Sequence, residues 1–279
     1  MSGDKLLSVS REHNIMRGQM DRRTSDLIAI LLSDGSMHKH KMPDGSIRHR
    51  ISFESVDTSV ARKFQEVISE ALGSKYSVHK RLPNNKNWSE VYYLSAIVPQ
   101  GIERNLLRHS KTYRTRPFAD RKFPESKIPD EIMSGTTEQK QSFLKLFASA
   151  EGSVILVPDR QRKWWVINRW ISIRCTHPVI SRQLRELLQS LNISSSGPEK
   201  EIIIKGEENL VKFQKFVGFI DGCRVTKKNN SKWVGTEKNK LLEAAILLYS
   251  TDKRCLKFAK TKEDVFYFLK SLLEARNAF

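Results

Sequence analysis

The chain has 279 residues, 39% of them hydrophobic, which is enough to bury the core of one large domain or of two domains of ordinary size. Its 49 Lys and Arg against 31 Asp and Glu give a formal net charge of +18, which favours nucleic acid as the partner. Three cysteines without a Cys-x-x-Cys pair, no signal-peptide core and no apolar run of about 20 residues argue against secreted and membrane-spanning proteins. We therefore expect an intracellular protein, in a prokaryotic cytoplasm or an organelle.

Residues 1–23 are polar and mixed in charge, so we expect them to form a loose N-terminal arm. Thr24 or Ser25 is a suitable N-cap for the apolar run 27–32 that follows. Gly35 is expected to stop this helix, since glycine readily ends helices.

Two strands are expected next, at 36–42 and 47–55, because the Pro-Asp-Gly sequence at 43–45 favours a tight turn between them. Side chains alternate between the two faces of a strand. The second strand thus has one face suited to packing under helices and another that is basic. The packing face carries Ile47, His49, Ile51 and Phe53, and the basic face carries Arg48, Arg50, Ser52 and Glu54.

The rest of the first half continues this alternation of helices and strands. Asp57 is expected to cap a helix that ends before Gly73, and Pro99 stands at the first turn of another. The expected elements are a helix to 72, strands near 75–81 and 91–98, and a helix at 100–109. Residues 111–136 are a basic linker without sustained periodicity, and a solvated connector and a DNA-tracking segment both remain open.

The second half repeats the first. Ile51-Ser52-Phe53 and Ile171-Ser172-Ile173 lie 120 residues apart, and Asp57 and His177 have the same offset, which indicates an internal duplication. Thr136 or Thr137 is expected to cap a helix that runs to 150. The further expected elements are strands at 153–157 and 165–174, a helix at 179–191, strands at 194–198 and 201–205, and helices at 207–217, 236–249 and 262–275.

One short pattern occurs in both halves, an apolar run that ends in an acid and a glycine. The runs are Leu27–Gly35 and Leu144–Gly152, and their acids are Asp34 and Glu151. The C-terminal end of a helix carries partial negative charge, so an acid there is unfavourable unless a cation compensates it. Two such ends side by side predict a cation site.

These two runs, each followed by strand, strand, helix, strand, strand and helix, resemble the LAGLIDADG homing endonuclease family in its monomeric, two-motif subclass. The resemblance implies an α+β fold of two pseudo-symmetric αββαββα repeats at 24–110 and 137–250, with a C-terminal helix at 251–279. It implies a central motif-helix pair and two antiparallel four-stranded sheets that form a DNA-binding saddle. Leu146 departs from the small residue usual in that helix contact and is expected to widen it.

The resemblance also implies an activity. This is a metal-dependent double-strand break, with short staggered ends, in a long asymmetric double-stranded DNA target. Magnesium is the expected cofactor, with Mn²⁺ or Ca²⁺ able to occupy the site. The implied metal ligands are Asp34 and Glu151, with the carbonyls of Ser33 and Ala150. The implied catalytic residues are the same two acids and the basic residues Lys111 and Lys227. Arg224 and Lys228 are alternatives to Lys227.

The outward strand faces are expected to contact the DNA, because Arg and Asn read base edges in the major groove while other residues bind phosphates. In the first half these are Arg48, Arg50, Ser52, His38, His40, Lys80 and Arg81. In the second half these are Arg160, Arg162, Lys163, Asn168, Trp170, Ser172 and Arg174.

The sequence leaves two other functions open. A catalytically weak protein of the same fold could act as an intron RNA maturase or a DNA-binding regulator, and a generic basic RNA-binding protein is a third reading. The chain does not end in the His-Asn pair of an intein, which favours a free-standing or intron-encoded product. With both motifs on one chain, we expect a monomer.

Overall fold

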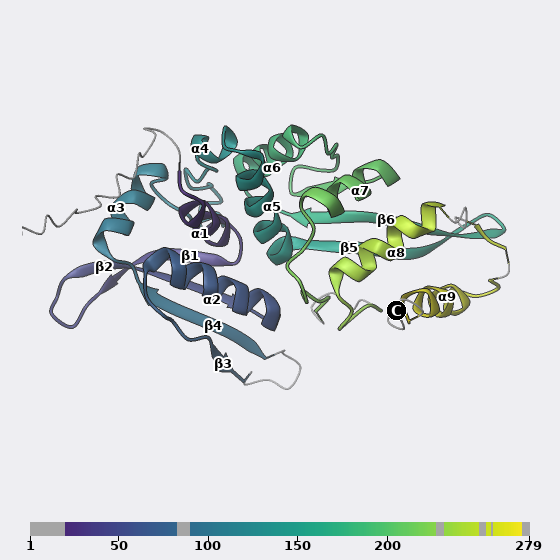
Figure 1. Cartoon of the computed structure of the whole chain (residues 1–279), viewed down its shortest axis with the longest axis horizontal. Coiled ribbons are helices and arrows are strands. Elements are labelled where there is room, and N and C mark those ends of the chain that lie inside the picture. The colour runs from purple at the N-terminus through teal and green to yellow at the C-terminus, as the bar shows by residue number, and fades with distance from the viewer. Residues whose placement is uncertain (1–19, 83–89, 227–231, 251–254, 258, 275–279) are drawn as a thin grey trace, which may run out of the picture.

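The computed structural model describes residues 20–82, 90–226, 232–250, 255–257 and 259–274. Two antiparallel sheets lie side by side, and a pair of helices stands between them (Figure 1). Within the described residues, no helix is both long and apolar enough to cross a lipid bilayer.

The first half has the expected order of elements. Its elements are α1 (Arg22–Leu32), β1 (Gly35–Lys41), β2 (Ile47–Ser55), α2 (Thr58–Leu72), β3 (His79–Arg81), β4 (Val91–Ile97) and α3 (Gln100–His109). Asp57 caps α2, because its carboxylate accepts hydrogen bonds from the backbone N–H groups of Ser59 and Val60. Gly73 ends α2 with a left-handed φ of 69°.

The second half follows a short connecting helix, α4 (Asp130–Met133), within the basic linker. Its elements are α5 (Thr137–Glu151), β5 (Gly152–Gln161), β6 (Trp164–Arg174), α6 (Pro178–Ser190), β7 (Glu201–Ile204), α7 (Glu207–Phe216), α8 (Lys238–Ser250), β8 (Cys255–Leu256) and α9 (Lys262–Glu274). Thr136 caps α5. A capping box begins α9: Thr261 and Asp264 exchange hydrogen bonds between side chain and backbone.

Strand pairing has the same register in both halves. The first sheet has the order β1-β2-β4-β3; the second has β5-β6-β7, with β8 paired to β6. After the motif acid, Gly35 pairs with Phe53 and Gly152 pairs with Ile173. The next pair is serine with serine in both sheets, as the internal duplication requires.

The first helix begins earlier than we expected. Asp21 is its N-cap and accepts hydrogen bonds from the backbone N–H and the hydroxyl of Thr24. The prediction of Thr24 or Ser25 was wrong because an aspartate side chain is a strong N-cap acceptor, and Ser25 is buried. The helix also ends at Leu32, before Gly35.

The expected strand at 194–198 does not form. Only one bridge, between Ser196 and Ile203, joins this segment to β7. Gly197 has a φ of +103° and Pro198 has no N–H group to donate, so neither residue can extend a ladder. Within the described residues, the fourth strand of the second sheet is instead the short β8, and β3 is shorter than the expected strand at 75–81.

A continuous core crosses from one half to the other. The helix α2 packs on β2 and β4, where the rings of Phe53 and Phe64 meet edge to face at 5.4 Å. In the second half α8 packs against β5 and α6 against β7. The helices α1 and α5 pack against each other between the sheets, so the two halves share one hydrophobic interior.

The N-cap of the middle helix in each half also contacts a segment outside its own repeat: the second half for α2, and the linker for α6. Asp57, the N-cap of α2, accepts a hydrogen bond of 2.6 Å from the backbone N–H of Arg224. His177, the N-cap of α6, lies in the equivalent place, and its Nε2 donates to the carbonyl oxygen of Pro124 at 2.9 Å. These contacts tie the first half to the second, and the linker to the second half, beyond the central helix pair.

Candidate nuclease site and nucleic-acid interface

The facing parts of the two motif helices are deeply buried. In α1 the side chains of residues 27–32 are at most 1% exposed, and in α5 Phe143, Leu144 and Ala148 are buried to the same degree. Leu146 is also buried, with 3% exposure, and its expected widening of the helix contact stays a prediction. The packing of α1 against α5 holds the two helix ends in place.

The glycine after each acid is required by close approach of the backbone. A Cβ atom at Gly35 would lie 2.5 Å from the carbonyl oxygen of Ile30, and a Cβ atom at Gly152 would meet that of Ala148. Gly152 has an extended backbone with φ −95°, so the requirement here is space and not a left-handed conformation. Each strand can therefore leave its helix immediately after the acid.

The two acids differ slightly in position. Glu151 is the last residue of α5 and is partly exposed, whereas Asp34 lies in the turn after α1 and is exposed. Neither helix has a basic residue in its last turn, in contrast to α3, which ends with Arg108 and His109. Each carboxylate therefore lies at the negative end of a helix dipole, a placement that a bound cation stabilises.

One basic side chain does reach the end of α5 from a distant element. Lys238, at the start of α8, is 7% exposed, and its Nζ donates a hydrogen bond of 2.8 Å to the carbonyl oxygen of Ser149. Lys238 was missed by the sequence reasoning. No local signal identifies it, since 89 positions separate it from Ser149. It stabilises the carbonyl end of α5 from within the core.

The thiol of Cys175 is near the second acid. Burial raises its pKa to about 11, and the negative charge of Glu151 adds to that rise. Burial likewise raises the pKa of Cys223 to about 11. Both thiols are therefore neutral at physiological pH.

The donors at the helix ends suit a hard divalent cation. Among the described residues, there is no cluster of three or more His, Cys, Asp or Glu side chains that could hold a metal by itself. Magnesium is commonly held by one or two carboxylates, with substrate phosphate and water completing its shell. Asp34 and Glu151, with the nearby carbonyls of Ser33 and Ala150, are donors of this type.

The expected basic catalytic residues have other partners or lie outside the described residues. Lys111 is 85% exposed and forms an ion pair of 3.4 Å with Glu125. Lys227 and its rival Lys228 lie outside the described residues. Arg224, the other rival, is engaged in the fold, with Nη1 donating to the carbonyl oxygen of Gly235 at 2.7 Å.

The open face of the first sheet is polar and rich in donors. Arg50 and His40 lie side by side, with 2.9 Å between Nη2 and Nε2, and the hydroxyls of Ser36 and Ser52 are also 2.9 Å apart. Burial, with the positive charge of Arg50, lowers the pKa of His38. Its imidazole is therefore mainly neutral at physiological pH and can donate or accept a hydrogen bond.

At the outer edge of the first sheet, the expected contacts are already paired with acids. Lys80 forms an ion pair with Glu90 at 2.8 Å and Arg81 forms one with Glu54 at 2.9 Å. All four side chains are at least 46% exposed. Such exposed pairs are weak, so a phosphate group can exchange for the acid.

The open face of the second sheet is less polar. Asn168 and Trp170 are half-buried and Ser172 is buried, and Asn168 donates to Asp159 at 3.1 Å. The hydroxyl of Ser172 donates to Glu201. Arg160 lies over the Trp165 ring at 5.8 Å. Arg162, Lys163 and Arg174 are exposed, so the basic groups of this half gather at the ends of the strands.

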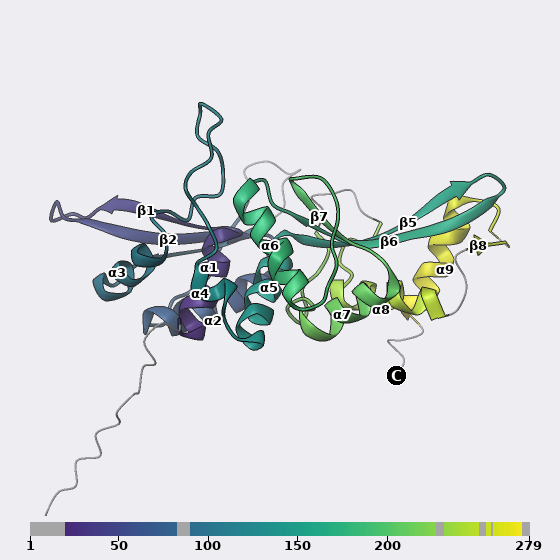
Figure 2. The ribbon, with the colours of Figure 1, turned by 90° about the horizontal axis from the view of Figure 1, so that it is seen from above.

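The open faces of both sheets lie on the side away from α2 and α8 (Figure 2). The chain is similar in fold to homing endonucleases. The LAGLIDADG meganuclease I-AabMI, bound to uncleaved DNA, superposes with a TM-score of 0.49 at 13% identity, covering 90% of this chain and 98% of that one.

Two further homing endonucleases share this likeness. I-WcaI, bound to its DNA recognition sequence, has a TM-score of 0.47 at 14% identity, covering 74% of this chain and 85% of that one. I-DmoI, in complex with DNA and Mn, has a TM-score of 0.44 at 14% identity, covering 71% of this chain and 96% of that one. Neither a protein-family model nor a curated protein sequence matches the chain. At these identities the likeness concerns the fold, and the function has to follow from the residues of this chain.

Proposed function

We propose that the chain is a LAGLIDADG-type homing endonuclease that uses a divalent cation to cut both strands of double-stranded DNA. The observation that carries the proposal is the packed pair α1 and α5. An acid stands at the C-terminal end of each helix: Asp34 in the turn after α1, and Glu151 as the last residue of α5. This pair stands at the junction of two sheets whose open faces are on one side.

Each part of the site has a defined role in phosphodiester hydrolysis. Asp34 and Glu151 would hold the cation, one acid for each DNA strand. A bound cation lowers the pKa of its water and stabilises the charge that develops on the scissile phosphate. The outward strand residues would orient the duplex so that the scissile phosphates lie over the helix ends.

The open faces also support an asymmetric target. The first face has paired Arg, His and Ser side chains along its strands, whereas the second has Asn168, Trp170 and Ser172 there and its arginines near the strand ends. Unlike faces read unlike half-sites. Since one chain supplies both acids, we also propose that the monomer is the active form, that Mg²⁺ is the physiological ion, and that cleavage leaves short staggered ends.

The test is to neutralise each acid without changing its shape. Asp34→Asn and Glu151→Gln should each reduce double-strand cleavage by about 100-fold or more, because charge stabilisation at the phosphate is lost. The substrate is the DNA that flanks the gene, or an allele that lacks it, with and without Mg²⁺. DNA affinity without metal should be unchanged or tighter, since a negative charge is removed from a phosphate-facing surface. Cleavage at the wild-type rate by either variant would exclude the assigned site, and binding without cleavage by wild type would indicate a regulator instead.

A further inference from the structure

A projecting loop in the linker is not used by the function above. Residues 111–125, called here the finger, leave the end of α3 and return towards α4. Figure 2 shows this segment rising beyond the sheets on the side opposite α2 and α8, next to β1. It therefore stands beside the surface on which we propose that the DNA lies.

The finger has a defined conformation that its own side chains hold. The Arg114 guanidinium donates to the carbonyl oxygens of Arg116 and Pro117, at 3.0 and 3.1 Å, and stacks 5.0 Å over the Phe118 ring. The Ser126 hydroxyl donates to the carbonyl oxygen of Arg114 at 2.5 Å and closes the loop at its base. An ordered loop loses less conformational entropy when it binds a partner.

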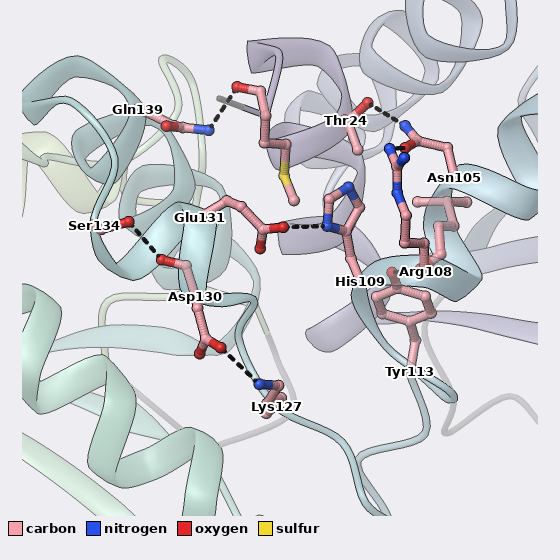
Figure 3. A network of polar contacts seen from close by, with 12 residues as sticks. Thr24, Asn105, Arg108, His109, Tyr113, Lys127, Asp130, Glu131, Ser134 and Gln139 are labelled. Carbon is pink, nitrogen blue, oxygen red and sulfur yellow. Dashed lines mark hydrogen bonds and ion pairs between the residues drawn. The ribbon is translucent and has the colours of Figure 1, made fainter. Parts of the chain in front are cut away.

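Both halves of the molecule anchor the base of the finger. On one side the Tyr113 hydroxyl donates to the Leu106 carbonyl oxygen at 2.7 Å, and His109 contacts Glu131 at 3.0 Å (Figure 3). On the other side the carbonyl oxygen of Pro124 accepts the hydrogen bond from His177, described above. The position of the finger relative to the sheets is therefore fixed.

Two arginines of the finger are exposed and can contact a partner molecule. The segment carries five basic residues and two acids, and each acid pairs with a lysine: Asp120 with Lys122 and Glu125 with Lys111, both at 3.4 Å. Arg114 is occupied within the loop. Arg116 and Arg121 are exposed and form no ion pair with any residue that the structure describes.

Arg121 also occupies an unfavourable backbone conformation. Its φ is +66°, inside a turn closed by a hydrogen bond of 2.8 Å from the Phe118 N–H to the Lys122 carbonyl oxygen. Such a φ costs a side chain with a Cβ about 1 kcal/mol or more, whereas glycine adopts it freely. Arg162, with φ +55°, is in the same situation in the two-residue loop between β5 and β6. Two arginines thus stand at projecting turns where glycine would be less strained, which points to a role outside the fold.

We propose that the finger is a second duplex-DNA contact, in which Arg116 and Arg121 bind the sugar-phosphate backbone beside the first sheet. This rests on the proposed function, since it needs DNA on the open faces. The planar guanidinium matches phosphate geometry, and phosphate contacts position a protein on DNA without reading its sequence. The finger then adds affinity and register, while base reading stays with the strands.

The experiment measures affinity for a duplex of arbitrary sequence and about 30 base pairs, without divalent metal, from about 50 to 200 mM salt. The variants are Arg116→Ala and Arg121→Gly, with Arg62→Ala, on the exposed face of α2, as the matched control. Each finger variant should weaken binding by roughly 3- to 10-fold and reduce the slope of log Kd against log salt by about 1. Arg121→Gly should keep or raise Tm, because the left-handed strain is relieved, so any loss of binding is not a loss of fold.

The outcomes separate this inference from the function. If both finger variants behave like Arg62→Ala while Arg48→Ala weakens binding, the finger proposal is overturned and the endonuclease proposal stands. If wild-type affinity for DNA is independent of salt, the endonuclease proposal fails and the finger proposal fails with it. A loss confined to duplex RNA of the same sequence would overturn DNA as the partner of the finger.

Discussion

Gly152→Ala tests whether the exit of the chain from α5 is a steric requirement. The backbone at Gly152, with φ −95° and ψ 153°, is one that alanine adopts without strain. The added methyl group would however meet the carbonyl oxygen of Ala148 and come within 3.3 Å of the Phe219 ring. One of these is helix backbone and the other is a fully buried ring, so neither can move away easily.

Overpacking of a rigid site costs about 1–3 kcal/mol. We therefore expect Gly152→Ala to lower the free energy of unfolding by roughly 2 kcal/mol, which for a chain of this size lowers Tm by about 4–8 °C. Gly35→Ala should do the same, because its Cβ atom would lie 2.5 Å from the Ile30 carbonyl oxygen. Cleavage should fall more than DNA affinity, since each change displaces the backbone next to an acid.

The assay is urea unfolding, which should show a lower midpoint at an unchanged m-value. Gly101→Ala is the matched control: it lies in α3, nothing is within 4 Å of its added Cβ atom, and alanine favours helix by up to about 1 kcal/mol. A Gly152→Ala midpoint at or above that of wild type would refute the close-approach explanation.

Two further predictions concern buried charge near the motif helices. Burial raises the pKa of Asp26, so folding favours its protonated form, and the wild type should gain stability as pH falls through that raised value. Asp26→Asn should therefore be more stable than wild type at neutral pH and lose this advantage in acid; a less stable variant in a Tm series against pH would contradict the reasoning. Lys238→Met should lower stability by about 2 kcal/mol and reduce cleavage, because a charge-assisted hydrogen bond to the end of α5 is lost. An unchanged urea midpoint would show that this bond contributes little.

Local signals were sufficient for much of the fold. The apolar runs, the Pro-Asp-Gly turn and the Asp57 cap each act through neighbouring residues, and the structure confirms the helices and strands they predicted around β1, β2 and α2. The expected strand at 194–198 failed for a local reason as well, since Gly197 and Pro198 could have warned against it. The roles of the DNA-facing residues stay predictions.

The cap of α5 by Lys238 and the contacts of the N-caps Asp57 and His177 outside their own repeats could not be predicted in this way. Each joins residues that are far apart in the chain, and only the packing of α1 on α5 brings them together. The available positions of Arg116 and Arg121 likewise depend on which neighbouring charges are paired in the folded finger.

The sequence by itself determined the repeat, the two acids and the basic character of one strand face, because periodicity, residue type and charge are properties of a single segment. Only the tertiary structure decided which basic groups are buried, which are paired and which project from the surface. The physical reason is that burial and ion pairing depend on distances between distant segments. Those distances are fixed only when the central helices pack and hold the two sheets side by side.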